Sequence, residues 1–496
     1  MKDLLPLFVA IPLGTAFLMP VFGRISRFLP DVLGNAATFA LAVLSCMAIN
    51  SPTVVYKVGG WEPVKGAVIG IYMVLDGLTI VMLLIVNIVG FLVCLYSVEY
   101  MRRYTDKARF YTLFLLMMTG MNGIVITGDL FNVFVFLEIS AIASYALVAF
   151  GTEAEELEAA FKYQVMGSVA SGFILVALSV FYWLTGTLNM ADGGKVLLEQ
   201  GQSAGALFAC ALFLMGFALK AAIMPFHAWL PDAHPSAPAP ISAMLSGVFI
   251  KATGIYVLCR VLFNVFGISV TTRHVLMTLG ALSMIAGVFL AIGQWDMKRL
   301  FAYHSISQMG YVVLGVGIGT PLGILGGLFH LMNHSTFKSL LFLNSGAVVY
   351  STDNRDLQKM GGLNQRMPVT GATSLIASMS IAGIPPFNGF WSKLIIILAA
   401  VQAEYYALAG LAVLGSIMTL ASFLKVQKYA FFGKLSPVWE KVKEAPVLMC
   451  VSMVLLAVLC VGMGCLLLPG VKEGLLDRAV EVLRNGKGYS NIVLGR

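Results

Sequence analysis

Charged residues are scarce in this sequence, at 11% of its 496 positions, whereas soluble domains carry about 25%. Hydrophobic residues make up 59%, and no polar stretch is long enough to form a soluble domain. The excess apolar surface must face lipid, so the composition excludes a soluble enzyme and predicts a polytopic membrane protein. The first apolar run ends without a small-residue cleavage site, so we expect no cleaved signal peptide.

Clustered cysteines are also missing. The seven cysteines are isolated and none forms a C-x-x-C pair, which argues against iron–sulfur clusters and structural zinc. No G-x-G-x-x-G or P-loop motif is present for a nucleotide. We therefore expect no cofactor and no metal, and any redox chemistry must belong to a partner chain. Whether that assembly is an enzyme stays open.

Apolar runs near 20 residues predict membrane-spanning helices. The sequence contains fourteen such runs, at 3–22, 31–49, 71–96, 110–127, 129–150, 162–184, 204–224, 240–266, 275–293, 298–318, 321–350, 368–403, 405–432 and 446–469. Seventeen basic residues fall on the even-side loops against five on the odd side, Lys65 among the five. The positive-inside rule then predicts a cell-membrane protein with its N-terminus outside. The same reasoning assigns the net charge of +8 to loop anchors and predicts no nucleic-acid partner.

Two of the runs are interrupted by proline, which removes a backbone donor and breaks a helix. Pro225 follows one run, and Pro385-Pro386 divides another. Similar short motifs surround both breaks and indicate two copies of a five-helix unit, which must be inverted, although chance similarity is the alternative. The predicted division is therefore 1–109 (three N-terminal helices), 110–266 and 274–432 (the two repeats), and 433–496 (the last helix and a tail).

Five ionisable side chains lie deep inside apolar runs: Glu138, Lys220, Lys251, Lys338 and Lys393. A charge near the bilayer centre costs about 2.5–3.5 kcal/mol, and spanning a membrane needs none. Lys220 and Lys393 each stand beside a proline break, where free carbonyls and water can hold them, although snorkelling to the interface is the alternative. We expect Glu138 to pair with Lys220, either to set its proton affinity or as a static link between helices.

His330, His334 and Lys338 recur at four-residue spacing, so they lie on one face of a helix. Imidazole titrates near neutrality and can relay protons. Metal binding is the competing interpretation, because two histidines four residues apart are a known ligand spacing, but no third ligand is visible.

A polar group follows the first proline break, and it consists of His227, Asp232 and His234. We interpret it as a connection between the buried charges and one side of the membrane, with an ordinary polar loop as the equal alternative. Asp76 and Arg260 are expected to be structural. The predicted proton path then runs through Glu138, Lys220, Lys251, the face of His330, His334 and Lys338, and finally Lys393.

These residues and their surroundings resemble a known family. Lys220 with residues 224–234, 238–243 and Lys251 resembles the core signature of the antiporter-like subunits of respiratory complex I. That family includes Mrp-type sodium/proton antiporter subunits and the ion-pumping subunits of membrane-bound hydrogenases. The motifs at 298–310 and 382–390 also match, and the resemblance covers about residues 70–430.

The resemblance implies an all-α protein of about fourteen helices, two inverted five-helix repeats with broken helices 7 and 12, and a central hydrated axis. It places Glu138, Lys220, Lys251 and Lys393 at the family's functional positions. A lysine at 393 and the lack of a long lateral helix favour the D-type component of Mrp antiporters or its hydrogenase counterpart.

The sequence therefore predicts a proton-translocating subunit, with other membrane subunits and the lipid bilayer as partners. A sodium-conducting subunit is one alternative, but a lysine-rich axis repels cations, so sodium would pass through a partner. A passive anchor of a redox complex is another, and it predicts no need for Glu138 or Lys220.

Overall fold

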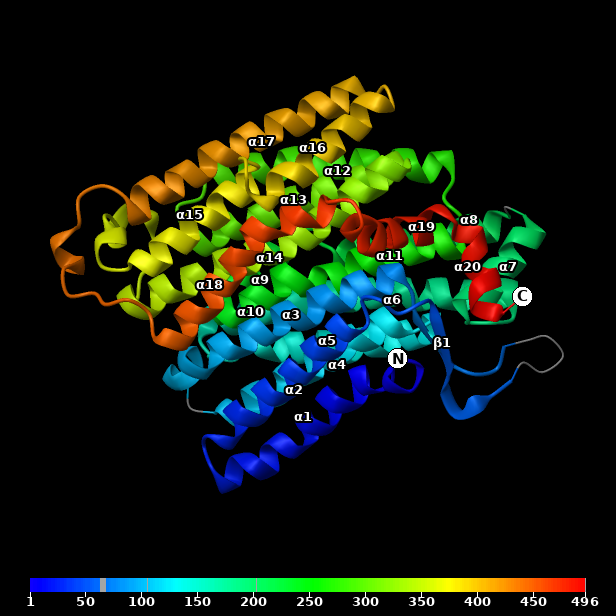
Figure 1. Ribbon diagram of the computed structural model, residues 1–496, viewed down its shortest axis with the longest axis horizontal. Helices are drawn as coiled ribbons and strands as arrows, with labels where there is room; N and C mark the ends of the chain where they lie inside the picture. The colour runs from blue at the N-terminus through cyan, green and yellow to red at the C-terminus, as the bar shows by residue number, and fades with distance from the viewer. Residues whose placement is uncertain (63–67, 105, 202, 496) are drawn as a thin grey trace.

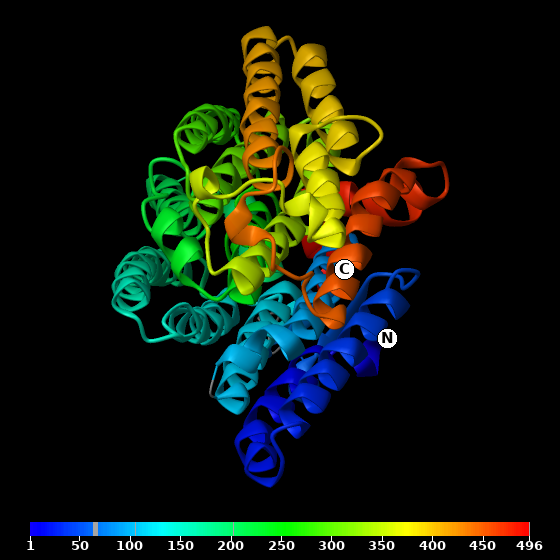
Figure 2. The same cartoon turned by 90° about the vertical axis from the view of Figure 1, so that its left-hand side faces the viewer.

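The computed structural model describes residues 1–62, 68–104, 106–201 and 203–495, so Lys65 lies outside the described residues. Most of the long helices run side by side in one common direction (Figure 1). The pair α1 (Leu7–Ile25) and α2 (Leu29–Met47) forms one edge of this bundle, and α16 (Asn388–Gln402) with α17 (Tyr406–Val426) forms the opposite edge in both views (Figure 2). The result is a mostly helical polytopic membrane protein.

The described residues contain ten helices long and apolar enough to cross a membrane, and the shorter helices α8, α15 and α16 are also apolar. The first half of the chain holds α3 (Gly77–Tyr100), α4 (Lys107–Ile126), α5 (Leu130–Val148), α6 (Ala154–Thr185), α7 (Met190–Gln200) and α8 (Ala204–Lys220). After α8 the chain continues through α9 (Leu230–Ser236), α10 (Ala239–Met244), α11 (Val257–Cys259), α12 (Val270–Ile292), α13 (Met297–Ile318), α14 (Pro321–Thr352), α15 (Pro368–Ala382), α18 (Val447–Gly462), α19 (Arg478–Arg484) and α20 (Gly486–Leu494).

A small sheet corrects the all-helical prediction. β1 (Val54–Lys57) pairs antiparallel with β2 (Tyr72–Leu75), with Val54 opposite Leu75. The apolar run predicts a helix throughout 71–96, but Tyr72–Leu75 form this strand instead. The helix starts only after Asp76, whose carboxylate accepts the backbone N–H of Thr79 at 2.9 Å and so fixes the N-terminus of α3.

Two further features differ from the sequence prediction, the start of α6 and an additional short helix after it. α6 begins at Ala154 rather than at 162, because Glu153 and Glu156 form a reciprocal capping box that starts the helix before its apolar part. The connection after α6 contains α7, which has no counterpart among the predicted runs. Its start is fixed by Asn189, whose side chain accepts the N–H groups of Ala191 and Asp192.

The helix α14 lies at the centre of the bundle, where it packs against α3, α10, α13, α15, α16 and α18. All of its residues from Gly323 to Val348 are buried. Its neighbour α13 packs closely on α12 across glycines; a Cβ at Gly280 would lie 2.6 Å from the backbone nitrogen of Leu314. The central position of α14 brings its histidines and lysine within reach of both halves of the chain.

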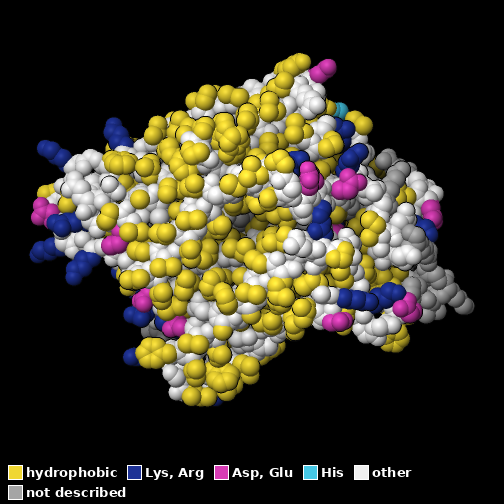
Figure 3. All heavy atoms as spheres, viewed as in Figure 1, with side chains coloured by type: hydrophobic (Ala, Val, Ile, Leu, Met, Phe, Trp, Pro, Cys, Tyr) yellow, Lys and Arg dark blue, Asp and Glu magenta, His cyan; other side chains and the backbone are white. Residues whose placement is uncertain are grey.

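The surface agrees with a membrane location. The face drawn in Figure 3 is hydrophobic over its middle, and charged side chains gather toward its two ends. The N-terminus, β1, α7 and α20 lie at one end of the bundle (Figure 1).

Candidate functional site

The first break in the bundle directly follows a buried lysine. α8 ends at Lys220, and the chain then turns through residues 221–229 before α9 begins. Ala222 takes a left-handed conformation with φ of 54°. The indole of Trp229 donates to the carbonyl of Leu219 at 3.0 Å and so satisfies one of the acceptors at the end of α8. Lys220 therefore stands beside irregular backbone at the end of a helix.

Lys220 faces Glu138, as the sequence predicts. Its Nζ lies 3.8 Å from Oε1 of Glu138, which is an ion pair but too long for a hydrogen bond. Among the described residues, this Nζ has no hydrogen-bond partner. Ser171 on α6 donates a short hydrogen bond to Glu138 and holds it in place. The Lys220 side chain is 3% exposed, whereas that of Glu138 is 31% exposed on the surface of the chain.

Lys251 lies in a widened stretch of helix. Residues Leu245–Phe249, Lys251–Tyr256 and Arg260–Val265 form π-helical turns, which place one extra residue in each turn and often occur at functional sites. The Lys251 ammonium is fully buried and donates to the carbonyl of Ser246, five residues earlier. The structure thus gives this lysine a main-chain oxygen as its partner.

The central face of α14 carries His330, His334 and Lys338, all fully buried. His330 lies between two partners, with Nδ1 2.9 Å from Ser392 Oγ and Nε2 3.2 Å from Gln308 Oε1. The ring of His334 is centred 6.5 Å from that of His330, and neither of its nitrogens has a partner among the described residues.

Lys338 ends the same face. It donates to the carbonyl of Phe301, and its Nζ lies 5.8 and 5.6 Å from the ring centres of Phe301 and Phe342. Both distances are within the range of a cation–π contact. Within the described ranges, no three His, Cys, Asp or Glu side chains are grouped so that they could hold a metal ion.

Lys393 stands at the second break. α15 ends at Ala382 and α16 begins at Asn388, so the two prolines lie in the irregular segment between them. The Lys393 ammonium donates to the carbonyl of Ile381 at 2.7 Å, an acceptor in the last turn of α15. It also lies 4.8 Å from the ring centre of Tyr311. Ser392, the preceding residue, contacts His330, so the second break is joined directly to the central face.

Three residues are predicted to connect the site to one side of the membrane, and they lie in different surroundings. Asp232 accepts from Lys162 at 3.2 Å and pairs with Arg299 at 3.3 Å. His234 is fully buried and stacks edge-on against Phe342, with both ring nitrogens unpartnered among the described residues. His227 is half-buried beside the first break.

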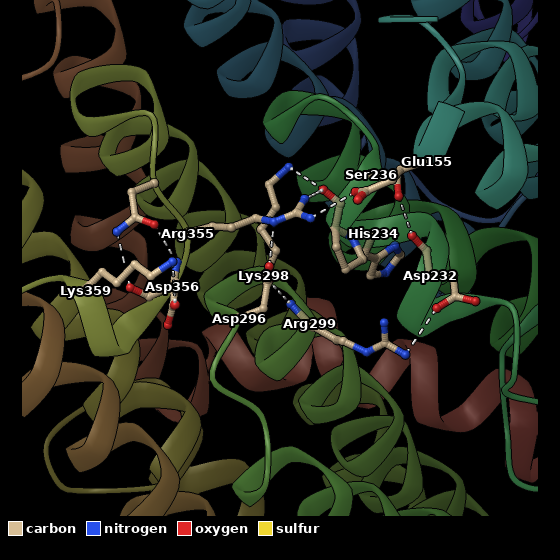
Figure 4. Close-up of polar contacts among 12 residues, drawn as sticks. Glu155, Asp232, His234, Ser236, Asp296, Lys298, Arg299, Arg355, Asp356 and Lys359 are labelled. Carbon is tan, nitrogen blue, oxygen red and sulfur yellow. Dashed lines mark hydrogen bonds and ion pairs between the residues drawn. The ribbon is translucent and has the colours of Figure 1, made fainter. Parts of the chain in front are cut away.

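A network of charges lies beside Asp232 and His234, and sequence reasoning did not identify it (Figure 4). Arg355 pairs with Asp296 at 2.6 Å and with Glu155 at 3.1 Å, so it links the segment after α14 to α13 and α6. Lys298 is buried and donates to the carbonyl of Ala237 at 2.6 Å. A cavity of about 290 Å³ opens among the charged side chains Glu155, Lys162, Asp232, Arg299 and Arg355.

Sequence reasoning also missed the small polar partners of the charged groups. Ser171 holds Glu138, and Gln308 and Ser392 hold His330. Gln308 falls within the motif at 298–310, whereas the signal for Ser171 and Ser392 is that each is a polar residue inside an apolar run. That signal is weak, because serine is common in membrane helices and usually bonds to its own helix.

Comparison with known proteins decides the family. Residues 127–419 match the family described as "NADH:quinone oxidoreductase/Mrp antiporter, TM". The chain belongs to this family. Residues 61–111 also match the description "NADH-Ubiquinone oxidoreductase (complex I), chain 5 N-terminus".

Members of several membrane complexes are similar to the chain. It is 35% identical over 438 residues to the D component of the Na(+)/H(+) antiporter of Alkalihalophilus pseudofirmus, covering 88% of each. It is 35% identical over 437 residues to the N component of the NADH-quinone oxidoreductase of Desulforudis audaxviator, covering 86% of each. It is 34% identical over 419 residues to hydrogenase-4 component B of Escherichia coli, covering 78% of this chain and 61% of that protein.

Two solved structures have nearly the same fold. A chain of the Mrp complex from a Dietzia species superposes with a TM-score of 0.90 at 28% identity, covering 100% of this chain and 99% of that one. A chain of the membrane-bound sulfane sulfur reductase, described as an archaeal respiratory membrane complex, gives a TM-score of 0.90 at 30% identity, covering 99% of both. Both structures are multisubunit membrane complexes.

Proposed function

We propose that this chain is the proton-translocating, antiporter-like subunit of a multisubunit cation/proton antiporter of the Mrp type, or of a related respiratory complex. One observation supports the proposal: several ionisable side chains are buried inside an otherwise apolar bundle, namely Lys220, Lys251, His330, His334, Lys338 and Lys393. Placing each of these side chains inside the membrane costs free energy, and helix packing alone requires none of them. Lys251, Lys338 and Lys393 each donate to a main-chain carbonyl, whereas Lys220 faces the carboxylate of Glu138.

The proposed path begins at the ion pair of Glu138 and Lys220. It continues through Lys251 to the central face of α14 and ends at Lys393. The contact of His330 with Ser392, next to Lys393, supports the last step. The 3.8 Å gap between Glu138 and Lys220 supports the first, because Lys220 can approach or leave the carboxylate without breaking a hydrogen bond.

The proposed architecture has fourteen membrane crossings. The seventh consists of α8 and the irregular segment after it, and the twelfth of α15 and α16 together. Residues 110–266 and 274–432 form the inverted repeats, preceded by 1–109 and followed by 433–496. With the N-terminus outside, the cavity beside Asp232 opens on the inner side, and Asp232, His234 and His227 connect the path to that side.

Partner subunits complete the site. Glu138 lies in the middle of the apolar helix α5, yet its side chain is 31% exposed. A carboxylate facing lipid at that depth would cost about 2.5–3.5 kcal/mol, so another membrane subunit covers this face. Sodium, which prefers oxygen ligands, is assigned to a partner because the buried lysines of this chain repel cations.

The test is proton or sodium gradient formation in vesicles that carry the assembled complex. Lys220→Ala and Lys393→Ala should each abolish the gradient while assembly stays intact. Lys220→Arg should also fail, because arginine stays protonated at any working pH. Lys359→Ala is the matched control, since Lys359 is 75% exposed in a loop and should be dispensable. Normal pumping by Lys220→Arg would mean that Lys220 is only a fixed charge, and the proposal would be wrong.

A further inference from the structure

Lys393, the last residue of the proposed path, stands at the boundary between an apolar and a polar half of the helices around it. Toward the connection between α16 and α17, on the side of the N-terminus in Figure 1, these helices are apolar. Residues 394–401 of α16, 407–415 of α17, 312–318 of α13 and 322–329 of α14 carry no polar side chain. These segments offer a proton nothing to bind on the way to that end.

A row of polar side chains leads from Lys393 in the other direction, along α17. Ser416 begins the row, with its Oγ 3.4 Å from the Lys393 ammonium. Thr419, Ser422 and Lys425 follow at three-residue spacing, so each lies beside the next on the helix surface. Thr419 and Ser422 are buried, at 0% and 1% exposure. Polar groups therefore continue from the second break to the last turn of α17.

The row ends beside the charged network around Arg355. The Lys425 ammonium donates to the carbonyls of Ile292 and Gln294 at 2.7 and 2.6 Å. Two residues after Gln294 comes Asp296, which pairs with Arg355. This network also borders the cavity of about 290 Å³, so the row and the cavity lie at the same end of the bundle. In the proposed orientation this end is the inner side.

A buried histidine joins the row to the central face of α14. His304 on α13 is fully buried, and its Nε2 lies 2.8 Å from Ser422 Oγ. It comes one turn after Phe301, whose carbonyl accepts from Lys338. The rings of His304 and Phe301 both pack on Phe423, with centres 4.7 and 5.7 Å away. Imidazole can accept a proton at one nitrogen and donate one from the other, so His304 is suited to carry protons here.

We propose that Lys393 exchanges protons with the inner side along this row, with His304 as the carrier between α17 and the central face. The inference rests on the proposed function and adds a second inner connection to the one at Asp232. Both ends of the proposed path then open on the same side, so transfer to the outer side needs the partner subunits. The alternative is that the row only ties helices together, as polar residues in membrane helices often do.

The first test removes the proton carrier and keeps its hydrogen bond. His304→Gln can still bond to Ser422 but cannot take up a proton at working pH. In vesicles that carry the assembled complex, we expect the initial rate of gradient formation per complex to fall by at least about tenfold. His274→Gln, at an exposed position on α12, is the control and should transport normally. A normal rate per complex in His304→Gln would overturn the proposal, even if the variant lowered the thermal midpoint.

The second test removes a hydroxyl that ties no helices together. Thr419 donates to the carbonyl of Gly415 in its own helix at 2.7 Å, so Thr419→Val keeps the shape of the side chain and breaks no link between helices. We expect the rate to fall about threefold, as for the loss of one hydrogen bond. Thr278→Val makes the same change on α12, where the hydroxyl bonds to the carbonyl of His274, and should transport normally. Equal rates in the two variants would overturn the proposal.

Lys393→Ala distinguishes failure of this inference from failure of the proposed function. If Lys393→Ala stops transport while His304→Gln and Thr419→Val transport normally, Lys393 is needed but is reached by another route, and only the inference is wrong. If Lys393→Ala itself transports normally, the proposed function is wrong. Loss of transport in Lys393→Ala together with slow transport in His304→Gln and Thr419→Val is the result that we expect.

Discussion

Glu138→Gln is the sharpest test of the ion pair beside the first break. At 3.8 Å and an effective dielectric constant of about 20, the attraction between Glu138 and Lys220 is about 4 kcal/mol. Solvent or partner groups at the 31% exposed Glu138 screen part of it. If only a third remains, about 1.4 kcal/mol, the substitution changes an equilibrium tenfold. We therefore expect proton transport to fall at least tenfold.

The assay is the initial rate of gradient formation in vesicles with equal amounts of assembled complex. Glu138→Asp keeps the charge but lengthens the gap, so it should retain part of the rate. Ser171→Ala removes only the hydrogen bond that aims Glu138, so it should cause a smaller loss than Glu138→Gln. An unchanged rate in Glu138→Gln would refute the reasoning, because the pair would then be a dispensable link between α5 and α8.

Other predictions concern stability. Gly389→Ala should cost about 1–3 kcal/mol by overpacking, because a Cβ there would collide with the carbonyl oxygen of Ser380 at the second break; a lower thermal midpoint would reveal it. Gly410→Ala is the control, since nothing lies within 4 Å of its added Cβ, and it should leave the midpoint unchanged or raise it slightly. Arg355→Ala should cost no more than about 1 kcal/mol, because its ion pairs are partly exposed; a double-mutant cycle with Asp296→Ala measures the coupling, and a larger value would contradict this estimate.

Much of the proposed site could be predicted because its signal is local. A charge inside an apolar run is costly wherever the chain folds, so Glu138, Lys220 and Lys393 stand out in the sequence alone. Proline likewise breaks a helix by its own geometry, and both breaks lie where the prolines indicate. Family membership was predicted from the motifs around these same residues.

The features that sequence reasoning missed depend on distant contacts. The strand at 72–75 forms because residues 54–57 pair with it, which periodicity in an apolar run does not reveal. The π-helical turns around Lys251 leave no clear sequence pattern. By sequence, Lys298 counts among the basic residues that anchor the loops. In the structure it is buried, and its ammonium donates to the main-chain carbonyls of residues 235 and 237. The Arg355 network joins segments more than a hundred residues apart and could be found only in the folded chain.

The main-chain partners of the buried lysines have a consequence for how this sequence can drift over time. Lys251, Lys338 and Lys393 each donate to a backbone carbonyl, on Ser246, Phe301 and Ile381. Every amino acid supplies a main-chain carbonyl, so replacing the side chains of Ser246, Phe301 and Ile381 leaves the three acceptors in place. Natural variation can therefore reshape the lining while the ammonium groups keep their positions. A shared backbone at a TM-score of 0.90 with only 28% identity is what such tolerance would produce.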